Sequence, residues 1–167
     1  MIRRVAFGKA VIAGVAGAGA WEGAVRLLIW FGLPMFDIVR ILSMMIVGRG
    51  APIWEWWPVG IAMHAMIGAI WAIFYAYFFW SFFDLNPTVQ GLLFSLLPAL
   101  LAGLIMIPQM DFMLNGQHPP LRVFAIGIGV LGPVSVVIGH LIYGLVMGSI
   151  YVRPVGYRVG RHKIQYG

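Results

Sequence analysis

The chain has 167 residues, of which 62% are hydrophobic and 10% are charged, and it contains no cysteine. A soluble domain is usually about 45–50% apolar and about 25% charged, and one aqueous core cannot bury this much apolar surface. The composition therefore predicts an integral membrane protein solvated by the lipid bilayer. Without cysteine, disulfides, thiolate metal sites, iron–sulfur clusters and cysteine nucleophiles are excluded.

The formal net charge is +6. The basic residues gather mainly near the two ends of the chain, which favours contact with anionic lipid headgroups and speaks against nucleic acid as a partner.

Four stretches are long and apolar enough to cross a bilayer, which takes about 20 residues of helix. They cover residues 5–33, 57–83, 88–108 and 133–152. The third follows Asn86-Pro87, a typical helix start. We therefore predict an all-α fold: an integral membrane four-helix bundle that forms a single transmembrane domain over residues 1–167.

Two shorter apolar segments follow the first and third spans, at residues 35–47 and 123–131. Both are too short to span, and the first carries Asp37 and Arg40, so we predict helices lying in the membrane interface. Residues 122–152 can also be read as one long kinked helix. Because Gly132-Pro133 interrupts them, we favour an interfacial helix followed by a separate span.

The ends of the chain indicate its orientation. Arg3, Arg4 and Lys9 precede the first span, and the tail at residues 153–167 carries four more basic residues. Basic residues near span ends favour the cytoplasmic side. We expect a multi-pass protein with both termini, including the basic tail, in the cytoplasm.

Spans two and four share a pattern of one histidine, two small residues and one tyrosine. The two sets align without a gap: His64, Gly68, Ala72 and Tyr75, and His140, Gly144, Gly148 and Tyr151. Helical spacing puts each set on one helix face. We predict two copies of a two-span hairpin. The shared face is either a helix-packing face, since small residues at this spacing are common there, or a joint site of the two histidines.

Several short motifs are similar to those of a known group. They are His64 to Gly68, Gly91 to Phe94, Pro108 and Gly139 to Gly144, together with the segment after span one. The chain resembles small four-span bacterial inner-membrane proteins of unknown function, the YagU-like group among them. The resemblance implies the four-span fold and a bacterial inner (cytoplasmic) membrane location, and it implies no activity.

Glu22 and Arg26 lie at positions i and i+4 inside the first span. A charge at the centre of a span costs about 2.5–3.5 kcal/mol on insertion scales, so such residues normally face protein or a wet cavity. One reading is a supporting ion pair that holds this span against the bundle. The other is that Glu22 accepts a hydrogen bond from His64 or His140 and completes a polar intramembrane site.

The two histidines also suggest a cofactor. Imidazole is an axial ligand of haem iron and of chlorophyll magnesium, and small neighbours leave room for a macrocycle. Haem or chlorophyll is therefore a possible ligand of His64 and His140, and bound lipids are expected. The scattered methionines are interpreted as packing residues, and Asp111 with His118 does not make a metal site.

No catalytic motif is present, so we expect a protein that is not an enzyme. The leading hypothesis is a non-catalytic subunit that docks by its small-residue faces onto other subunits of a larger membrane complex, with respiratory or photosynthetic energy metabolism as the candidate setting. The alternatives are a small transporter or channel whose polar site is formed by Glu22, Arg26, His64 and His140, and a haem- or chlorophyll-binding electron-transfer subunit.

Overall fold

The computed structural model describes residues 5–80 and 85–151, and the predicted basic tail lies outside this part of the chain. The described residues form helices and connecting turns, without strands. Four helical stretches are long and apolar enough to cross a membrane: Phe7–Trp30, Ile53–Phe79, Pro87–Leu114 and Leu131–Ile150. The prediction of an all-α protein with four such helices is confirmed.

The first span is α1, Phe7–Trp30. The chain turns at Gly32, whose φ of +83° is easily reached only by glycine, and the short helix α2 follows at Ile38–Val47. The Asp37 carboxylate caps α2 by accepting a hydrogen bond from the backbone N–H of Arg40 at 2.8 Å.

The second span begins one turn before the predicted start at residue 57. It consists of α3, Ile53–Phe74, and a π-helical continuation, η1, Tyr75–Phe79. Pro52 precedes α3 in an extended conformation. Glu55 lies in the first turn of α3, where a carboxylate interacts favourably with the positive end of the helix dipole.

The third span also extends beyond its predicted range. α4, Pro87–Leu101, passes into the π-helical segment η2, Ala102–Met106, and then into α5, Ile107–Leu114. The predicted end at Pro108 is therefore too early. Proline lacks a backbone N–H, and the π-helical turn directly before it takes up the change in the hydrogen-bond ladder, so the helix continues.

The fourth span, α6, covers Leu131–Ile150 and is preceded by the short 3₁₀ turn η3, Val123–Ile128. Gly129, with φ +106°, separates the two, so residues 122–152 do not form one kinked helix. The proline at 133 stands in the first turn of α6, where its missing N–H is tolerated.

The predicted interfacial helix at residues 123–131 is not a regular helix. Phe124 and Ala125 have φ values of +51° and +58°, and the Phe124 ring lies over Gly103, where an added Cβ would come within 2.3 Å of it. The Asp111 carboxylate accepts a hydrogen bond from the backbone N–H of Leu121 at 2.7 Å. The segment is therefore tied onto the end of the third span.

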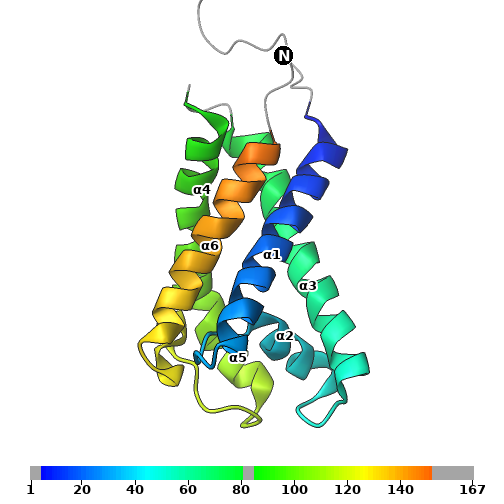
Figure 1. Cartoon of the computed structure of the whole chain (residues 1–167), viewed down its shortest axis with the longest axis vertical. Coiled ribbons are helices and arrows are strands. Elements are labelled where there is room, and N and C mark those ends of the chain that lie inside the picture. Colours follow the sequence, from blue (N-terminus) through cyan, green and yellow to red (C-terminus); the bar gives the residue numbers. More distant parts are fainter. Residues whose placement is uncertain (1–4, 81–84, 152–167) are drawn as a thin grey trace, which may run out of the picture.

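The four spans are not packed equally. α1 packs against both α3 and α6, α6 packs against α4, and α2 packs against α3. α2 and α5 lie at the end of the bundle opposite the N-terminus (Figure 1). α3 and α4 have little backbone contact, and aromatic rings bridge them, with Trp71 6.1 Å and Tyr75 5.1 Å from Phe94 between ring centroids.

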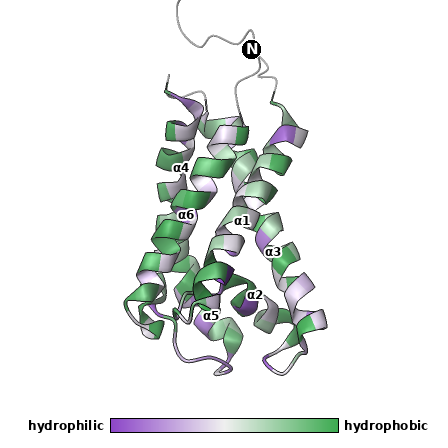
Figure 2. Ribbon diagram, viewed as in Figure 1, coloured by the Kyte–Doolittle hydropathy of each residue, from purple (hydrophilic) through white to green (hydrophobic). Residues whose placement is uncertain are grey.

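The surface of the spans is apolar. Figure 2 shows hydrophobic residues along the spans, and most of the hydrophilic ones near the two ends of the bundle. Large apolar side chains such as Ile12, Ile70, Leu100 and Leu145 are exposed. This distribution suits a protein whose sides contact acyl chains.

Candidate functional site

The two histidines of the shared pattern lie close together in the bundle. His64 comes from α3, His140 from α6, and both rings contact the indole of Trp21 on α1, with centroid separations of 5.0 and 4.5 Å. All three side chains are buried. The sequence indicated the histidines, but it gave no role to Trp21.

A glycine makes room for this indole. At Gly139, next to His140 on α6, an added Cβ would lie 2.2 Å from the ring of Trp21. α6 can therefore approach α1 at this level only because residue 139 has no side chain. Gly139 belongs to the Gly139 to Gly144 motif that resembles the YagU-like group. Its position next to His140 was the sequence signal that could have indicated a close contact here.

The polar atoms of this cluster are not all satisfied. Nδ1 of His140 pairs with the backbone carbonyl oxygen of Val136, one turn earlier, at 2.7 Å. His64 makes no hydrogen bond within the described residues, and the buried Nε1–H of Trp21 has no acceptor there either. Unpaired buried polar groups carry a penalty of about 1–3 kcal/mol each, so a ligand that pairs with the His64 imidazole would be stabilised.

A cavity lies beside the cluster, with a volume of about 60 Å³. Its walls are almost entirely apolar and include, besides the two histidines and Trp21, the side chains of Tyr143, Met106 and Met110. No lining residue carries a formal charge, so nothing there would stabilise an ionic ligand.

This volume bears on the tetrapyrrole hypothesis. Pockets for drug-sized ligands measure about 300–1,000 Å³, and a porphyrin or chlorin macrocycle exceeds a 60 Å³ cavity many times over. Trp21 also fills the space against both imidazoles. Ligation of haem or chlorophyll by His64 and His140 would therefore require the helices to separate.

The predicted ion pair of Glu22 and Arg26 forms a separate cluster with Asp37, a residue whose link to this pair the sequence did not indicate. Arg26 donates from Nε to Glu22 Oε1 and from Nη2 to Asp37 Oδ1, so it joins α1 to the N-terminus of α2. The guanidinium groups of Arg26 and Arg40 lie 5.7 and 4.7 Å from the ring centroid of Trp56 on α3. The charges thus fasten α2 against α1 and α3.

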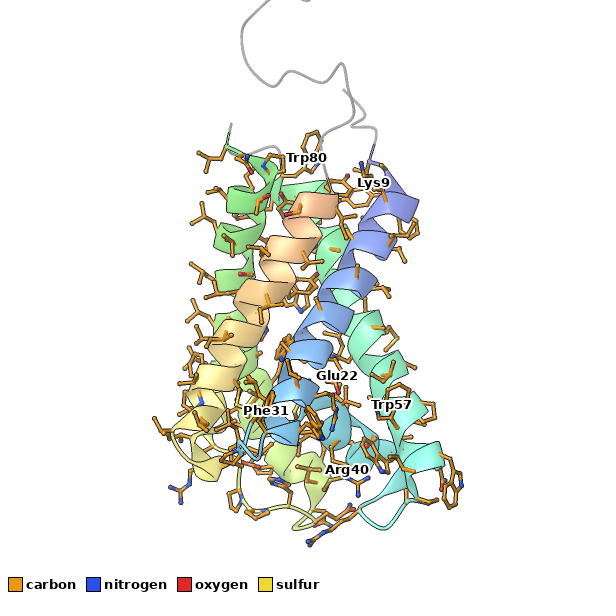
Figure 3. All side chains as sticks on the ribbon, viewed as in Figure 1. Lys9, Glu22, Phe31, Arg40, Trp57 and Trp80 are labelled. Atoms are coloured by element: carbon orange, nitrogen blue, oxygen red, sulfur yellow. The ribbon has the colours of Figure 1, made fainter. Side chains whose placement is uncertain are left out.

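Glu22 makes no hydrogen bond to either histidine. Its Oε1 accepts from Arg26, while Oε2 is buried without a partner in the described residues. Glu22 lies in the half of the bundle that also holds Arg40 and Trp57, away from Lys9 and Trp80 (Figure 3). Neither Glu22 nor Arg26 lines the cavity. The four residues of the expected polar site therefore divide into a histidine pair and an ion cluster.

The small residues of the shared pattern lie at contacts between spans. An added Cβ at Gly68 would lie 2.7 Å from the carbonyl oxygen of Gly14 on α1, and Ala72 adjoins the same glycine. At Gly144, an added Cβ would lie 2.4 Å from the carbonyl oxygen of Gly91 on α4. These contacts use the small faces inside the bundle, so the faces are not open to a partner.

The rest of the pattern is also internal. Gly148 packs on Gly91, where an added Cβ would meet it at 2.8 Å, and the rings of Tyr75 and Tyr151 are 5.9 Å apart. The Tyr143 hydroxyl on α6 donates a hydrogen bond to the Gly68 carbonyl oxygen on α3 at 2.7 Å.

Among the described residues, no three histidines, aspartates or glutamates are placed to hold a metal ion. Comparison with known proteins identifies no relative: no family model matches the chain, and neither the curated proteins nor the solved structures include a match.

Proposed function

We propose that this protein is a non-catalytic integral membrane subunit that docks onto a larger membrane assembly through the outward face of α1. This outer α1 face comprises Ile12, Val15, Gly19, Gly23 and Leu27, all exposed along one side of the helix. The observation that carries the proposal is that Gly19 and Gly23, one turn apart, have no atom within 4 Å of an added Cβ.

The two kinds of glycine in α1 differ in what they contact. Gly14 and Gly17 adjoin α3 and α6, where an added Cβ would lie 2.3 and 2.8 Å from neighbouring atoms. The glycines at 19 and 23 have no such internal reason. Each destabilises a helix by about 1 kcal/mol relative to alanine.

A partner helix supplies the reason. Association of spanning helices depends on van der Waals contact, because lipid is as apolar as the side chains, and paired glycines one turn apart allow two backbones to approach closely. The docking role predicted for the small-residue faces of the chain therefore falls to the outer α1 face.

Site-specific photocrosslinking in intact membranes tests the proposal. A photoreactive amino acid at Val15, on the outer α1 face, is expected to give a discrete higher-mass adduct. The same residue at Leu145, an equally lipid-exposed position on α6, serves as the matched control. The adduct at Val15 should disappear when Gly19 and Gly23 are both replaced by leucine. Adducts at neither position, or equally at both, would refute docking through α1. An adduct with twice the chain mass would replace the larger assembly by a homodimer.

The internal repeat, the interfacial helix, the family and the cellular location are also proposals. The equivalent positions of His64 and His140 around Trp21 support two copies of a two-span hairpin. The capped, apolar α2 supports an interfacial location for that helix. Membership of the YagU-like group, the bacterial inner membrane, cytoplasmic termini and a setting in energy metabolism rest on the sequence.

A small transporter is the second candidate, and the cavity beside the histidine pair is the observation that favours it. The ion cluster lies outside this cavity, so a transported molecule would depend on His64 and His140. Flux into proteoliposomes that is lost in His64→Ala but kept in His118→Ala would support transport.

A further inference from the structure

We propose that the cavity between the spans binds an uncharged lipophile with a hydroxyl or carbonyl head, which enters sideways from the acyl-chain region of the bilayer. The inference goes beyond docking through α1, since it concerns a different side of the bundle and different residues.

The exposure of the cavity walls shows where the cavity opens. The lining residues nearest the α2 end, Phe36, Ile38 and Met110, are at most 7% exposed. Those with appreciable exposure belong to α3 and to the third span, Ile67 on one side and Met106, 39% exposed, on the other. The cavity therefore opens between these two spans.

This opening lies at a weak seam of the bundle. α3 and α4 have little backbone contact, and aromatic rings fill much of the space between them. Of the lining residues at the opening, Trp71 and Ala102 stand well inside the spans Ile53–Phe79 and Pro87–Leu114. A molecule entering here comes from the hydrocarbon region, so it must be soluble in lipid.

The inner end of the cavity selects the head group. The imidazole nitrogens of His64, and the ring nitrogen of His140 that is not bound to backbone, provide hydrogen-bonding positions on the cavity wall. The Nε1–H of Trp21 is sealed against Gly139 and does not reach the cavity. A hydroxyl group can both donate to and accept from imidazole nitrogens, and a carbonyl can accept from an imidazole N–H. No charged residue lines the walls, so a phosphate or quaternary ammonium head would be buried without compensation.

The volume limits how much of the ligand is enclosed. The cavity volume of about 60 Å³ is well below the roughly 300–1,000 Å³ of pockets that enclose drug-sized ligands. A small head group fits, and the chain of the lipophile would lie along the opening beside Ile67 and Met106 towards the bilayer. A macrocycle or a phospholipid headgroup does not fit.

Photolabelling of the full chain in lipid nanodiscs tests the inference. The probe is a hexadecanol analogue that carries a diazirine next to its hydroxyl-bearing carbon. Labelling is expected on the peptides that contain Trp21 and Met106. Excess hexadecanol should compete, whereas hexadecylphosphocholine, with the same chain and a charged head, should not.

Two pairs of variants identify the site. His64→Phe keeps an aromatic ring but removes the ring nitrogens, and labelling should fall about fivefold, the factor expected for one neutral hydrogen bond. His118→Phe is the matched control outside the cavity. Ala102→Trp should block the opening, whereas Leu104→Trp, on the same span but 54% exposed, should not. Circular dichroism and gel filtration establish that each variant is folded.

Labelling that is spread over the lipid-exposed surface, that survives both His64→Phe and Ala102→Trp, or that hexadecylphosphocholine displaces equally well would overturn the proposal. Stoichiometric binding of Ag(I) that is lost in His140→Phe and in Met106→Leu, without photolabelling for which hexadecanol competes, would also overturn it. Since Met106 and Met110 line the same cavity, that result would assign a soft-metal site instead.

Discussion

Replacing Gly91 by alanine perturbs a close backbone contact of the bundle, that between α4 and α6. The added Cβ would lie 2.2 Å from the carbonyl oxygen of Gly144 and 2.7 Å from the Cα of Gly148, whereas ordinary van der Waals contact begins at 3.4 Å. Both obstacles are backbone atoms and cannot rotate away. α4 and α6 must therefore move apart by about 1 Å at this level, which also loosens the contacts above and below it.

The expected magnitude combines two opposing effects. Overpacking of a tight interface destabilises by about 1–3 kcal/mol, and alanine in place of glycine recovers about 0.5–1 kcal/mol of helix stability. We expect Gly91→Ala to lower the free energy of unfolding by about 1–2 kcal/mol. Titration of the purified protein with sodium dodecyl sulfate in mixed micelles, followed by circular dichroism, measures this difference.

Gly23→Ala is the matched control, since it makes the same chemical change on α1 where no atom lies within 4 Å. It should leave the stability unchanged or raise it by up to about 1 kcal/mol. If Gly91→Ala proves as stable as the original chain, or if both variants lose the same stability, the close contact of α4 with α6 is wrong.

Three further predictions concern the ion cluster around Arg26, the indole of Trp21 and the hydroxyl of Tyr143. Arg26→Gln leaves two carboxylates without their cation and should destabilise the bundle by about 1–3 kcal/mol, while Glu22→Gln combined with it should recover part of the loss, as measured by the same titration. Gly139→Ala places a Cβ 2.2 Å from the indole of Trp21, so the near-ultraviolet circular dichroism should change while helix content does not. Gly139→Ala should lower the stability of the original chain but cost no further stability in a Trp21→Ala background, where the indole is absent. Tyr143→Phe removes one hydrogen bond between α6 and α3 and should lower stability by about 0.6 kcal/mol; a loss above about 2 kcal/mol would contradict the assigned single bond.

The number and type of the spans are properties that the sequence alone determined. Hydropathy is local, and about 20 apolar residues in succession have one stable arrangement in lipid, since every backbone N–H and C=O must then be bonded within the helix. The shared spacing of the His64 and His140 motifs was also readable from the sequence, because helical spacing repeats regularly along each helix.

The limits of the spans were less readable. Pro108 indicates the end of a helix by local rules. The helix nevertheless continues to Leu114, because the π-helical segment before the proline changes the backbone hydrogen-bond pattern where the proline N–H is missing. Phe124 belongs to an apolar segment that suggests a helix, yet it packs on Gly103 in a left-handed conformation. The extent of the third helix thus depended on a change of backbone hydrogen bonding, and the shape of the segment at Phe124 depended on its contact with Gly103.

The partners of the buried polar groups were decided only by tertiary structure. Asp37 lies in a segment that looked interfacial, and the turn at Gly32 brings its carboxylate to Arg26. Which small faces remain free was equally hidden, because Gly14 and Gly23 look alike in sequence while only Gly14 adjoins a neighbouring helix. Spacing along a helix specifies which residues share a face, but the neighbour of that face depends on how the helices pack against one another.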